Sequence, residues 1–438
     1  MTGDEGADTN MKQTEQKKMF APRRRKLDNV ALAFPSATGK KDSRVFRICC
    51  RLKAPVDGRL LQEALAAAVR TYPTFHSVLK RGNFWYYFET SSEEPIVKRQ
   101  KKDSVPCAPL YQKRRENLLY KLRYEGVQIN LEVYHALTDG TGAIAFLSEV
   151  VKNYLELRYP DQLQKADEAE GETQLAASIE EQEEDSFFKY YSPEPQEPLR
   201  RKSQRAYQLR GRRVRQQEMR YLACMLSVRE LLALTKKRGV TVTEYLTAVL
   251  IDAVGKQMTR LERFQARPVT IMIPVDLRKF YPSRSMSNFF GWMEIEYNFT
   301  GSDSFEKILA HVRQRFADDL ARGQVAARMN RYIALEKLPV LHFVPLELKE
   351  LILRLGTTLG SRNVTAVFSN MGIVRLPERY IPYVDSFGAA ASTDKLQVCA
   401  LSWGDRFYFS ITSKYVYSEI PQRMLERLRR DGLTARYC

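Results

Sequence analysis

Residues 127–140 read VQINLEVYHALTDG. From Val127 to Tyr134, apolar and polar side chains alternate, which is the pattern of a strand with one buried face. The alternation stops at His135, and apolar residues recur at helical spacing after Gly140. The sequence therefore predicts a strand, a short loop that starts at His135, and a helix. Loops held between rigid elements are frequent positions for catalytic residues.

The rest of the chain shows a similar mixture of strand and helix patterns. Upstream, we predict a strand at residues 45–48, a helix over 57–69 capped by Asp57, and an aromatic strand at 83–88. Downstream, the sequence from Thr241 to Glu244 predicts a capping box that starts another helix. Further strands are predicted at 269–274, 364–370, 396–400 and 407–411, and further helices at 304–322 and 419–430. The expected fold class is α/β, with mixed sheets and flanking helices.

Two folded lobes joined by a charged segment are the expected organisation, because 438 residues exceed what one core usually serves. Residues 1–26 read as a disordered basic tail, and 27–160 as the N-terminal lobe. Residues 161–218 hold an acidic block, several prolines and an arginine-rich block, which is typical of a linker or crossover. The C-terminal lobe is expected over 219–438.

The composition is that of a globular protein with excess positive charge: hydrophobic residues make up 44% and the net charge is +18. This charge favours anionic partners such as nucleic acid, acidic lipid or a phosphate-bearing cofactor, and leaves contact with a membrane surface open. The sequence contains no signal-peptide pattern, no apolar run of the ~20 residues that span a membrane, and no C-x-x-C pair. We therefore expect a soluble, cytoplasmic protein with reduced cysteines.

Of the four histidines, His135 has the most suggestive setting. Asp139 lies four residues on, and Gly140 follows, where a side chain would block the close approach of a substrate. An imidazole with a pKa of about 6.5 accepts a proton at neutral pH, as the activation of a hydroxyl or amine requires. Asp139 could form a relay with His135 or hold the loop by pairing with a cation elsewhere. No metal site is predicted, because no two histidines have ligand spacing.

The pattern His135-x-x-x-Asp139-Gly140 at a strand-to-helix loop resembles the HxxxDG motif of the acyltransferase superfamily with the chloramphenicol acetyltransferase-like fold. That superfamily includes condensation domains, plant BAHD acyltransferases, polyketide-associated acyltransferases and alcohol acetyltransferases. Other segments are similar in the same order: residues 52–85, Pro274-Val275-Asp276-Leu277-Arg278, Ser287-Asn288-Phe289-Phe290-Gly291 and Ser369-Asn370-Met371-Gly372. The resemblance implies two lobes of this fold with an active-site channel between them.

The resemblance also implies a role for each matching residue. His135 is the general base, and Asp139 is structural, paired with Arg278 from the second lobe. Gly140 leaves room for the pantetheine arm of the donor. Asn370 polarises the thioester carbonyl or lines the tunnel, with a simple turn residue as the alternative. The implied reaction moves an acyl group from acyl-CoA or an acyl-carrier protein, as co-substrate, to an alcohol or amine, without a bound cofactor.

Two departures narrow the resemblance. Tyr134 stands where condensation domains have a second histidine, and the Asp-Phe-Gly-Trp-Gly signature of the plant enzymes is absent. The expectation is therefore a free-standing, monomeric enzyme similar to the alcohol acetyltransferases. Two alternatives stay open: a catalytically inactive scaffold of the same fold, and a protein that binds nucleic acid through its arginine-rich block.

Overall fold

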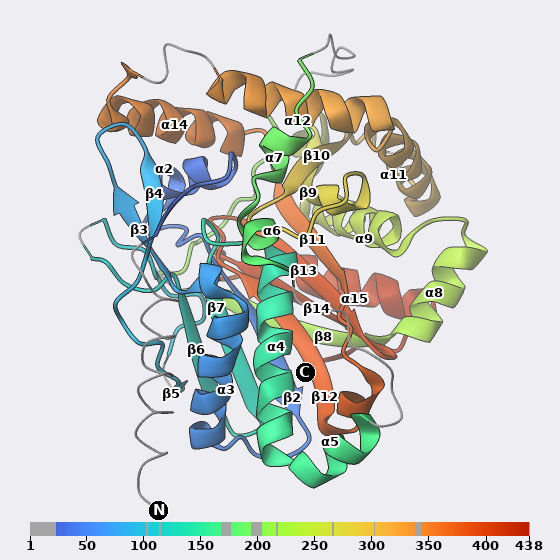
Figure 1. Cartoon of the computed structure of the whole chain (residues 1–438). Helices are drawn as coiled ribbons and strands as arrows, with labels where there is room; N and C mark the ends of the chain where they lie inside the picture. The colour runs from blue at the N-terminus through green and yellow to red at the C-terminus, as the bar shows by residue number, and fades with distance from the viewer. Residues whose placement is uncertain are drawn as a thin grey trace, which may run out of the picture.

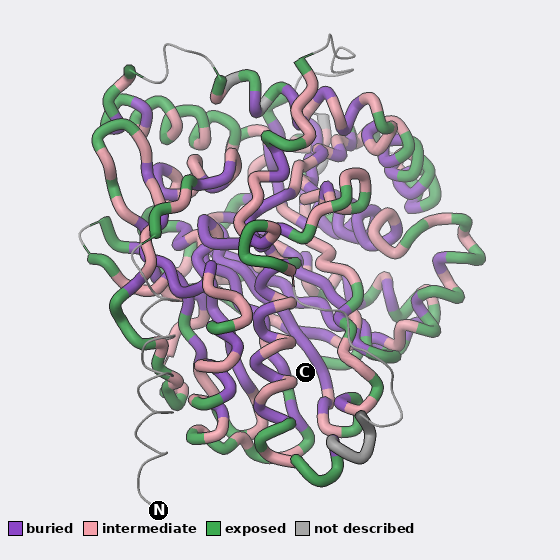
Figure 2. The backbone as a smooth tube through the Cα atoms, in the orientation of Figure 1, coloured by how far each residue is buried: buried purple, intermediate pink, exposed green. Residues whose placement is uncertain are grey.

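The computed structural model describes residues 23–101, 104–113, 115–167, 177–193, 204–215, 218–264, 267–301, 303–337 and 343–437. Its strands form a five-stranded, a seven-stranded and a three-stranded sheet, with helices packed around the two larger ones (Figure 1). Buried backbone runs through both large sheets (Figure 2). The α/β class predicted from the sequence is confirmed.

The five-stranded sheet has the order β12-β2-β7-β6-β5. Its central strands β2 (Val45–Leu52) and β7 (Gln128–Tyr134) pair antiparallel. Helices α3 (Gly58–Thr71) and α4 (Gly140–Arg158) pack against each other, and α4 also contacts β2 and β7. Asp57 caps α3 as predicted. The remaining short elements of this half are η1 (Ala31–Ala33), α2 (Phe34–Ala37), η2 (Pro73–Phe75), β5 (Lys98–Arg99) and β6 (Tyr120–Glu125).

The seven-stranded sheet has the order β10-β9-β11-β13-β14-β8-β15 and lies beside helix α9 (Val242–Gln257). Thr241 and Glu244 form the predicted capping box of α9. The strands are β8 (Arg220–Ser227), β9 (Val269–Asp276), β10 (Phe290–Tyr297), β11 (Ala366–Ile373), β13 (Leu396–Trp403), β14 (Arg406–Ser413) and β15 (Arg436–Tyr437). The other helices are α8 (Val228–Lys237), α10 (Arg260–Phe264), η3 (Leu277–Lys279), α11 (Phe305–Asp319), α12 (Arg322–Glu336), α14 (Leu346–Ser361), η4 (Glu378–Tyr383) and α15 (Ile420–Arg430). None of the helices in the described ranges is long and apolar enough to cross a membrane.

Strand β12 (Val384–Ala391) joins the two halves of the chain. It pairs antiparallel with β2 of the five-stranded sheet and packs on β13 and β14 of the seven-stranded sheet. At Gly388 this approach is so close that a Cβ atom would lie 2.8 Å from Cys49 Sγ and 2.9 Å from Tyr408 Cζ. The predicted boundary, which gave all of 219–438 to the second lobe, is therefore wrong for β12, because strand pairing is set by distant partners.

The predicted disordered tail over residues 1–26 is too long. Residues Arg24–Lys26 form strand β1, which pairs antiparallel with β4 (Tyr86–Thr90), and β4 pairs with β3 (Ser77–Arg81). The guanidinium of Arg25 lies 4.4 Å from the centre of the Phe88 ring. The backbone N–H and C=O groups of β1 can therefore bond to β4, a strand from a distant part of the sequence. Residues 1–22 of the predicted tail lie outside the described residues.

The predicted linker over residues 161–218 is partly folded onto both halves. It contains α5 (Pro160–Asp167), α6 (Ile179–Glu183) and α7 (Ser186–Lys189). Phe187 of α7 is fully buried in a small core with Leu277 and Phe289, and Tyr207 is buried in the core of the second half. These segments of the predicted linker or crossover are therefore anchored to the folded halves by single aromatic residues. Residues 168–176, 194–203 and 216–217 lie outside the described residues.

Candidate active site

His135 lies where the two halves meet. Strand β7 ends at Tyr134, and the backbone N–H of His135 donates to the carbonyl of Arg44 at 2.8 Å, which continues the pairing of β7 with β2. Helix α4 begins five residues later at Gly140. His135 therefore occupies a short loop whose two ends are fixed by a buried strand and a buried helix.

The imidazole of His135 is surrounded by aromatic rings from both halves. Phe34 of α2 stacks on it with ring centroids 4.7 Å apart, while Phe46 of β2 and Phe290 of β10 lie at 4.9 and 5.5 Å. His135 nevertheless keeps intermediate solvent exposure. Burial lowers the pKa of His135 below its ordinary value of 6.5, because a charged imidazolium is poorly solvated there. The ring is thus held neutral at physiological pH, and the residue keeps part of its surface exposed.

Asn288 determines which nitrogen of His135 carries the proton. Its Oδ1 lies 3.2 Å from His135 Nδ1, while its Nδ2 donates to Asp28 Oδ2 at 3.0 Å. Because the amide nitrogen faces the carboxyl group, the amide oxygen faces the ring and accepts from Nδ1–H. This places the lone pair of the neutral ring on Nε2. Burial raises the pKa of Asp28 to about 7, so its charge changes near neutrality.

Asp139 is engaged at both carboxylate oxygens. Oδ1 accepts from the N–H of Gly142 and caps α4, whereas Oδ2 accepts from the N–H of Phe289 at 3.0 Å and from Arg278 Nη1 at 2.7 Å. Arg278 also donates from Nη2 to the carbonyl oxygens of Ser285 and Ser287. Among the described residues, no hydrogen bond joins Asp139 to His135. The carboxylate therefore holds the motif loop against the second half of the molecule.

Gly142 and Thr138 add a second link between the halves. Thr138 Oγ1 donates to the carbonyl of Met286 at 2.6 Å. A Cβ atom on Gly142 would overlap Thr138 Oγ1 and lie 3.0 Å from that carbonyl. Gly142 was not among the predicted site residues, although the sequence Gly140-Thr141-Gly142 at the start of a helix is a visible signal.

The structure brings Gly140 close to the segment that contains Asn370. A Cβ atom on Gly140 would meet the Met371 side chain at 3.4 Å, an ordinary contact, so the protein itself tolerates a small side chain there. Asn370 Nδ2 donates to Thr243 Oγ1, and its Oδ1 accepts from the N–H of Gly372, which has a φ of 82°. Within the described ranges, no hydrogen bond joins Asn370 to His135.

Sequence reasoning missed Asp28 and the role of Asn288. Asn288 belonged to a recognised segment but gave no local sign that it would face His135. Asp28 follows the basic run that the sequence assigns to a tail, and it lies two residues after the end of β1. The pairing of β1 with a distant hairpin and the hydrogen bonds from Asn288 hold Asp28 near the site.

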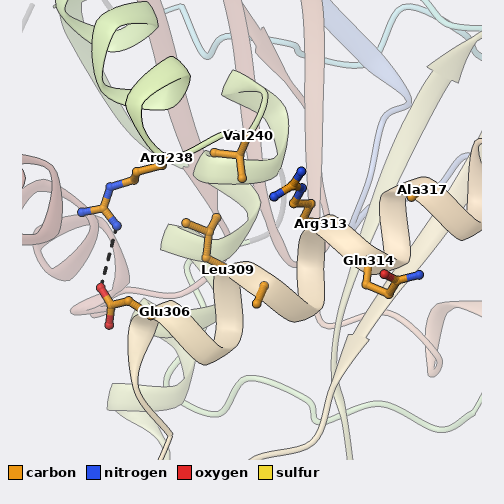
Figure 3. Close-up of a pocket in the computed structure, with 8 residues that line it drawn as sticks. Arg238, Val240, Glu306, Leu309, Arg313, Gln314 and Ala317 are labelled. Carbon is orange, nitrogen blue, oxygen red and sulfur yellow. Dashed lines mark ion pairs between the residues drawn. The ribbon is translucent and has the colours of Figure 1, made fainter.

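A surface pocket lies elsewhere, along α11 and the turn before α9 (Figure 3). Arg238 forms an ion pair with Glu306 at its edge, at 3.8 Å. None of its lining residues contributes to the surroundings of His135 described above. Among the described residues, no group of three or more His, Cys, Asp or Glu side chains could hold a metal ion.

Comparisons with known proteins agree with this architecture. Residues 218–379 match the family model of the phthiocerol/phthiodiolone dimycocerosyl transferase C-terminus. A search of curated protein sequences finds no significant match. Among solved structures, polyketide synthase associated protein 5 from Mycobacterium tuberculosis is 14% identical, with a TM-score of 0.56, and the alignment covers 92% of this chain and 96% of that one.

Two further structures show the breadth of the likeness. TRI101 of F. sporotrichioides, complexed with coenzyme A and T-2, is 13% identical with a TM-score of 0.61, and the alignment covers 95% of this chain and 99% of that one. The first condensation domain of the calcium-dependent antibiotic synthetase is 14% identical with a TM-score of 0.56, and coverage is 93% and 95%. Because the likeness spans nearly the whole chain, this protein has the two-lobed chloramphenicol acetyltransferase-like fold of these structures.

Proposed function

We propose that this protein is an acyltransferase that moves an acyl group from a thioester donor to an alcohol or amine, with His135 as the general base. The observation that carries the proposal is the setting of this imidazole. It is neutral, partly exposed at the junction of both halves, and held by Asn288 so that the Nε2 lone pair is available.

The proposed reaction is direct transfer. Nε2 removes the proton of the acceptor hydroxyl or amine while the acceptor oxygen or nitrogen bonds to the thioester carbonyl carbon. The tetrahedral adduct then breaks its C–S bond, and the imidazolium returns the proton to the leaving sulfur. No covalent enzyme intermediate is needed, because a single imidazole serves as base and then as acid.

The matched family and the solved structures support acyl transfer as the reaction class. The family model is named for a dimycocerosyl transferase, and TRI101 was solved with coenzyme A. The net charge of +18 suits the phosphates of coenzyme A or an acidic carrier protein. The proposal therefore includes both acyl-CoA and acyl-carrier protein as thioester donors.

The other motif residues are assigned supporting roles. Asp139 and Arg278 hold the loop of His135 against the second half through their 2.7 Å ion pair. Gly140 would leave space for the pantetheine arm of the donor. Asn370 is better suited to shaping the turn at Gly372 than to polarising a carbonyl, because both ends of its amide are engaged by protein groups.

A thiol-release assay tests the proposal. Acyl-CoA donors of increasing chain length are combined with mixed alcohols and amines, and free thiol is followed with the wild type and with His135→Ala. We expect the substitution to lower the rate by about 10²–10⁴-fold, as for the loss of a general base.

His311→Ala is the matched control, since this histidine lies on α11 and contacts the carbonyl of Glu296. Its activity should stay near that of the wild type. Acyl transfer that survives in His135→Ala would disprove the role of the imidazole. A wild type that transfers no acyl group from any donor would favour the inactive scaffold.

A further inference from the structure

Helix α14 (Leu346–Ser361) presents its apolar side to solvent. Five large apolar residues at helical spacing are each about half exposed, and we call them the α14 stripe: Leu348 48%, Leu351 53%, Ile352 54%, Leu355 56% and Leu359 57%. They lie on one face, because Leu348, Ile352, Leu355 and Leu359 follow one another at three or four residues, and Leu351 lies three residues after Leu348 and four before Leu355. A surface helix of a globular protein normally turns this face toward the core.

The opposite, polar side of α14 anchors the helix to the protein. Lys349 is 6% exposed, donates from Nζ to the carbonyl of Phe84 at 2.8 Å and lies 3.4 Å from the Trp85 ring centre. Glu350 accepts from Lys113 at 2.7 Å and from Arg81 at 3.3 Å. These specific contacts fix the rotation of the helix, so the outward direction of the stripe is built into the fold.

Two more large apolar residues are exposed near α14. Phe84, at the tip of the β3–β4 hairpin that contacts α14, is 44% exposed, and Phe343, just before the helix, is 81% exposed. Figure 1 shows the hairpin directly beside α14 at one edge of the molecule, and Figure 2 shows the outer side of the helix as exposed. An exposed apolar stripe of five residues is large enough to mark an interaction site.

The charge around the stripe identifies its partner. Arg354 lies beside the stripe and Arg362 follows the end of the helix; both are exposed, and neither forms an ion pair with a carboxylate in the described part of the chain. Lys26 is exposed on β1, in the same small sheet as the hairpin, and the whole chain carries a charge of +18. Leucine and isoleucine on one face, with one arginine beside it and another at the end of the helix, are features of a helix that lies in a membrane interface.

We propose that the α14 stripe docks this protein on the surface of a lipid bilayer that contains anionic lipids, with the helix lying in the plane of the membrane. The stripe offers no hydrogen-bonding group to a protein partner, because all five of its side chains are aliphatic. A fluid acyl-chain layer accepts such a surface without specific complementarity.

The position of α14 connects docking with the candidate active site. The helix contacts α2, whose Phe34 stacks on His135. If the proposed function holds, the substrate class that this arrangement favours is a lipophilic acceptor or acyl chain delivered from the bilayer. This consequence rests on the proposed function, whereas membrane docking itself does not.

Vesicle sedimentation tests the docking. The full chain is mixed with vesicles of phosphatidylcholine alone or of phosphatidylcholine with phosphatidylglycerol, and bound protein is measured in the pellet. We expect binding to the mixed vesicles, and we expect Leu351→Glu with Leu355→Glu to weaken it by at least about tenfold. The matched control is Leu232→Glu with Leu261→Glu, on α8 and α10, where the residues are 52% and 71% exposed.

The control carries the same change of charge as the α14 variant and should bind like the wild type. Equal binding by the two double variants, or a wild type that stays in the supernatant with both vesicles, would overturn the proposal. Light scattering after size exclusion gives a further outcome. A wild-type dimer that becomes a monomer only in the α14 variant, without vesicle binding, would show instead that the stripe joins two copies of this chain.

Activity separates docking from catalysis. His135→Ala should bind vesicles normally and lose acyl transfer, whereas the α14 variant should keep transfer to a soluble short-chain alcohol. Its transfer to a long-chain alcohol held in vesicles should fall about tenfold with the loss of binding. Vesicle binding by a wild type without acyl transfer would refute the proposed function and leave docking standing.

Discussion

The two ends of the His135–Asp139 loop have opposite surroundings. At one end, His135 has three aromatic rings around it and an amide oxygen at Nδ1. At the other end, both oxygens of Asp139 are occupied by donors from α4, Arg278 and the backbone of Phe289. Nε2 of His135 is therefore left to accept a proton, whereas both carboxylate oxygens of Asp139 already accept hydrogen bonds.

This difference shows why a histidine and an aspartate four residues apart need not form a catalytic relay. The carboxylate stabilises the start of α4 and the contact between the two halves, whereas the imidazole is oriented by an amide from the second half. We therefore expect substitutions at the Asp139 end to change the free energy of unfolding and substitutions at the His135 end to change the rate.

The largest effect on stability is expected for Asp139→Ala. The change leaves Arg278, whose side chain is 11% exposed, without its closest carboxylate, and it removes the cap of α4. Breaking one partner of a buried pair costs about 3–5 kcal/mol. Urea denaturation should show this loss as a lower midpoint.

Asp276→Ala is the matched control, because Asp276 contacts the same guanidinium at 3.4 Å with a side chain that is 32% exposed. Asp276 also accepts from the backbone N–H of Arg278, so its loss should cost about 0.5–2 kcal/mol, less than the loss of Asp139. An Asp139→Ala protein with wild-type stability and no activity would contradict the structural role and favour a relay.

Gly142→Ala should come next. A Cβ atom at this position overlaps Thr138 Oγ1 and crowds the Met286 carbonyl, so the hydrogen bond between them must break or α4 must shift. Overpacking of this kind costs about 1–3 kcal/mol. Gly140→Ala, where the nearest atom is 3.4 Å away, should cost clearly less in the same denaturation experiment.

If Gly140→Ala were the more destabilising substitution, the packing at the start of α4 would differ from that described here. A further measurement distinguishes the two glycines. Gly140→Ala should raise the KM for the thioester donor if the pantetheine arm passes this position, whereas Gly142→Ala should lower the amount of folded protein.

Much of this organisation was predictable because local patterns set it. The alternation before His135 gave β7, and Asp57 and Thr241 gave the starts of α3 and α9 through side-chain caps. The elements that escaped prediction depend on distant partners. Strand β12 pairs with β2, and β1 pairs with β4, and neither pairing leaves a trace in the neighbouring sequence.

The candidate site was predictable to the same extent. His135, Asp139 and Arg278 follow from a motif and its resemblance, and the structure places the last two 2.7 Å apart. Asn288 and Asp28 act through contacts between segments 260 residues apart, so no spacing rule could find them. The outward face of α14 was also missed, since an apolar stripe in a sequence normally indicates burial.

A smaller effect, on rate, is expected for Asn288→Ala. Without the amide oxygen, nothing from the second half selects the tautomer with the proton on Nδ1. Loss of a residue that orients a catalytic group costs about 10-fold or somewhat more. The decrease should appear in kcat, with KM for both substrates little changed.

Asn370→Ala serves as the comparison, because its amide is engaged by Thr243 and Gly372. The Asn370→Ala substitution should leave kcat close to that of the wild type when the rate is expressed per amount of folded protein. A large fall in kcat in Asn370→Ala, together with none in Asn288→Ala, would show that Asn370 and not Asn288 assists the reaction.

The smallest and most direct prediction concerns the titration of His135. Burial lowers its pKa, so the neutral base persists below pH 6.5 and the imidazolium forms only at more acidic pH. The unfolded chain binds this proton more readily, so the associated stability is present above pH 6.5 and declines as the pH falls through the folded pKa. Phe34→Ala should open one face of the ring and move its pKa upward toward 6.5.

Histidine ring signals in nuclear magnetic resonance measure this titration, with the His135 signal assigned by its loss in His135→Ala. The ring is preferable to the rate as a readout, because Asp28 titrates near pH 7 and would also alter a rate profile. A ring that titrates above pH 6.5 in the wild type would mean that a carboxylate, not the aromatic surroundings, controls its charge. His135 and Asp139 would then both be controlled by charged groups, and the difference between the two ends of the loop would not exist.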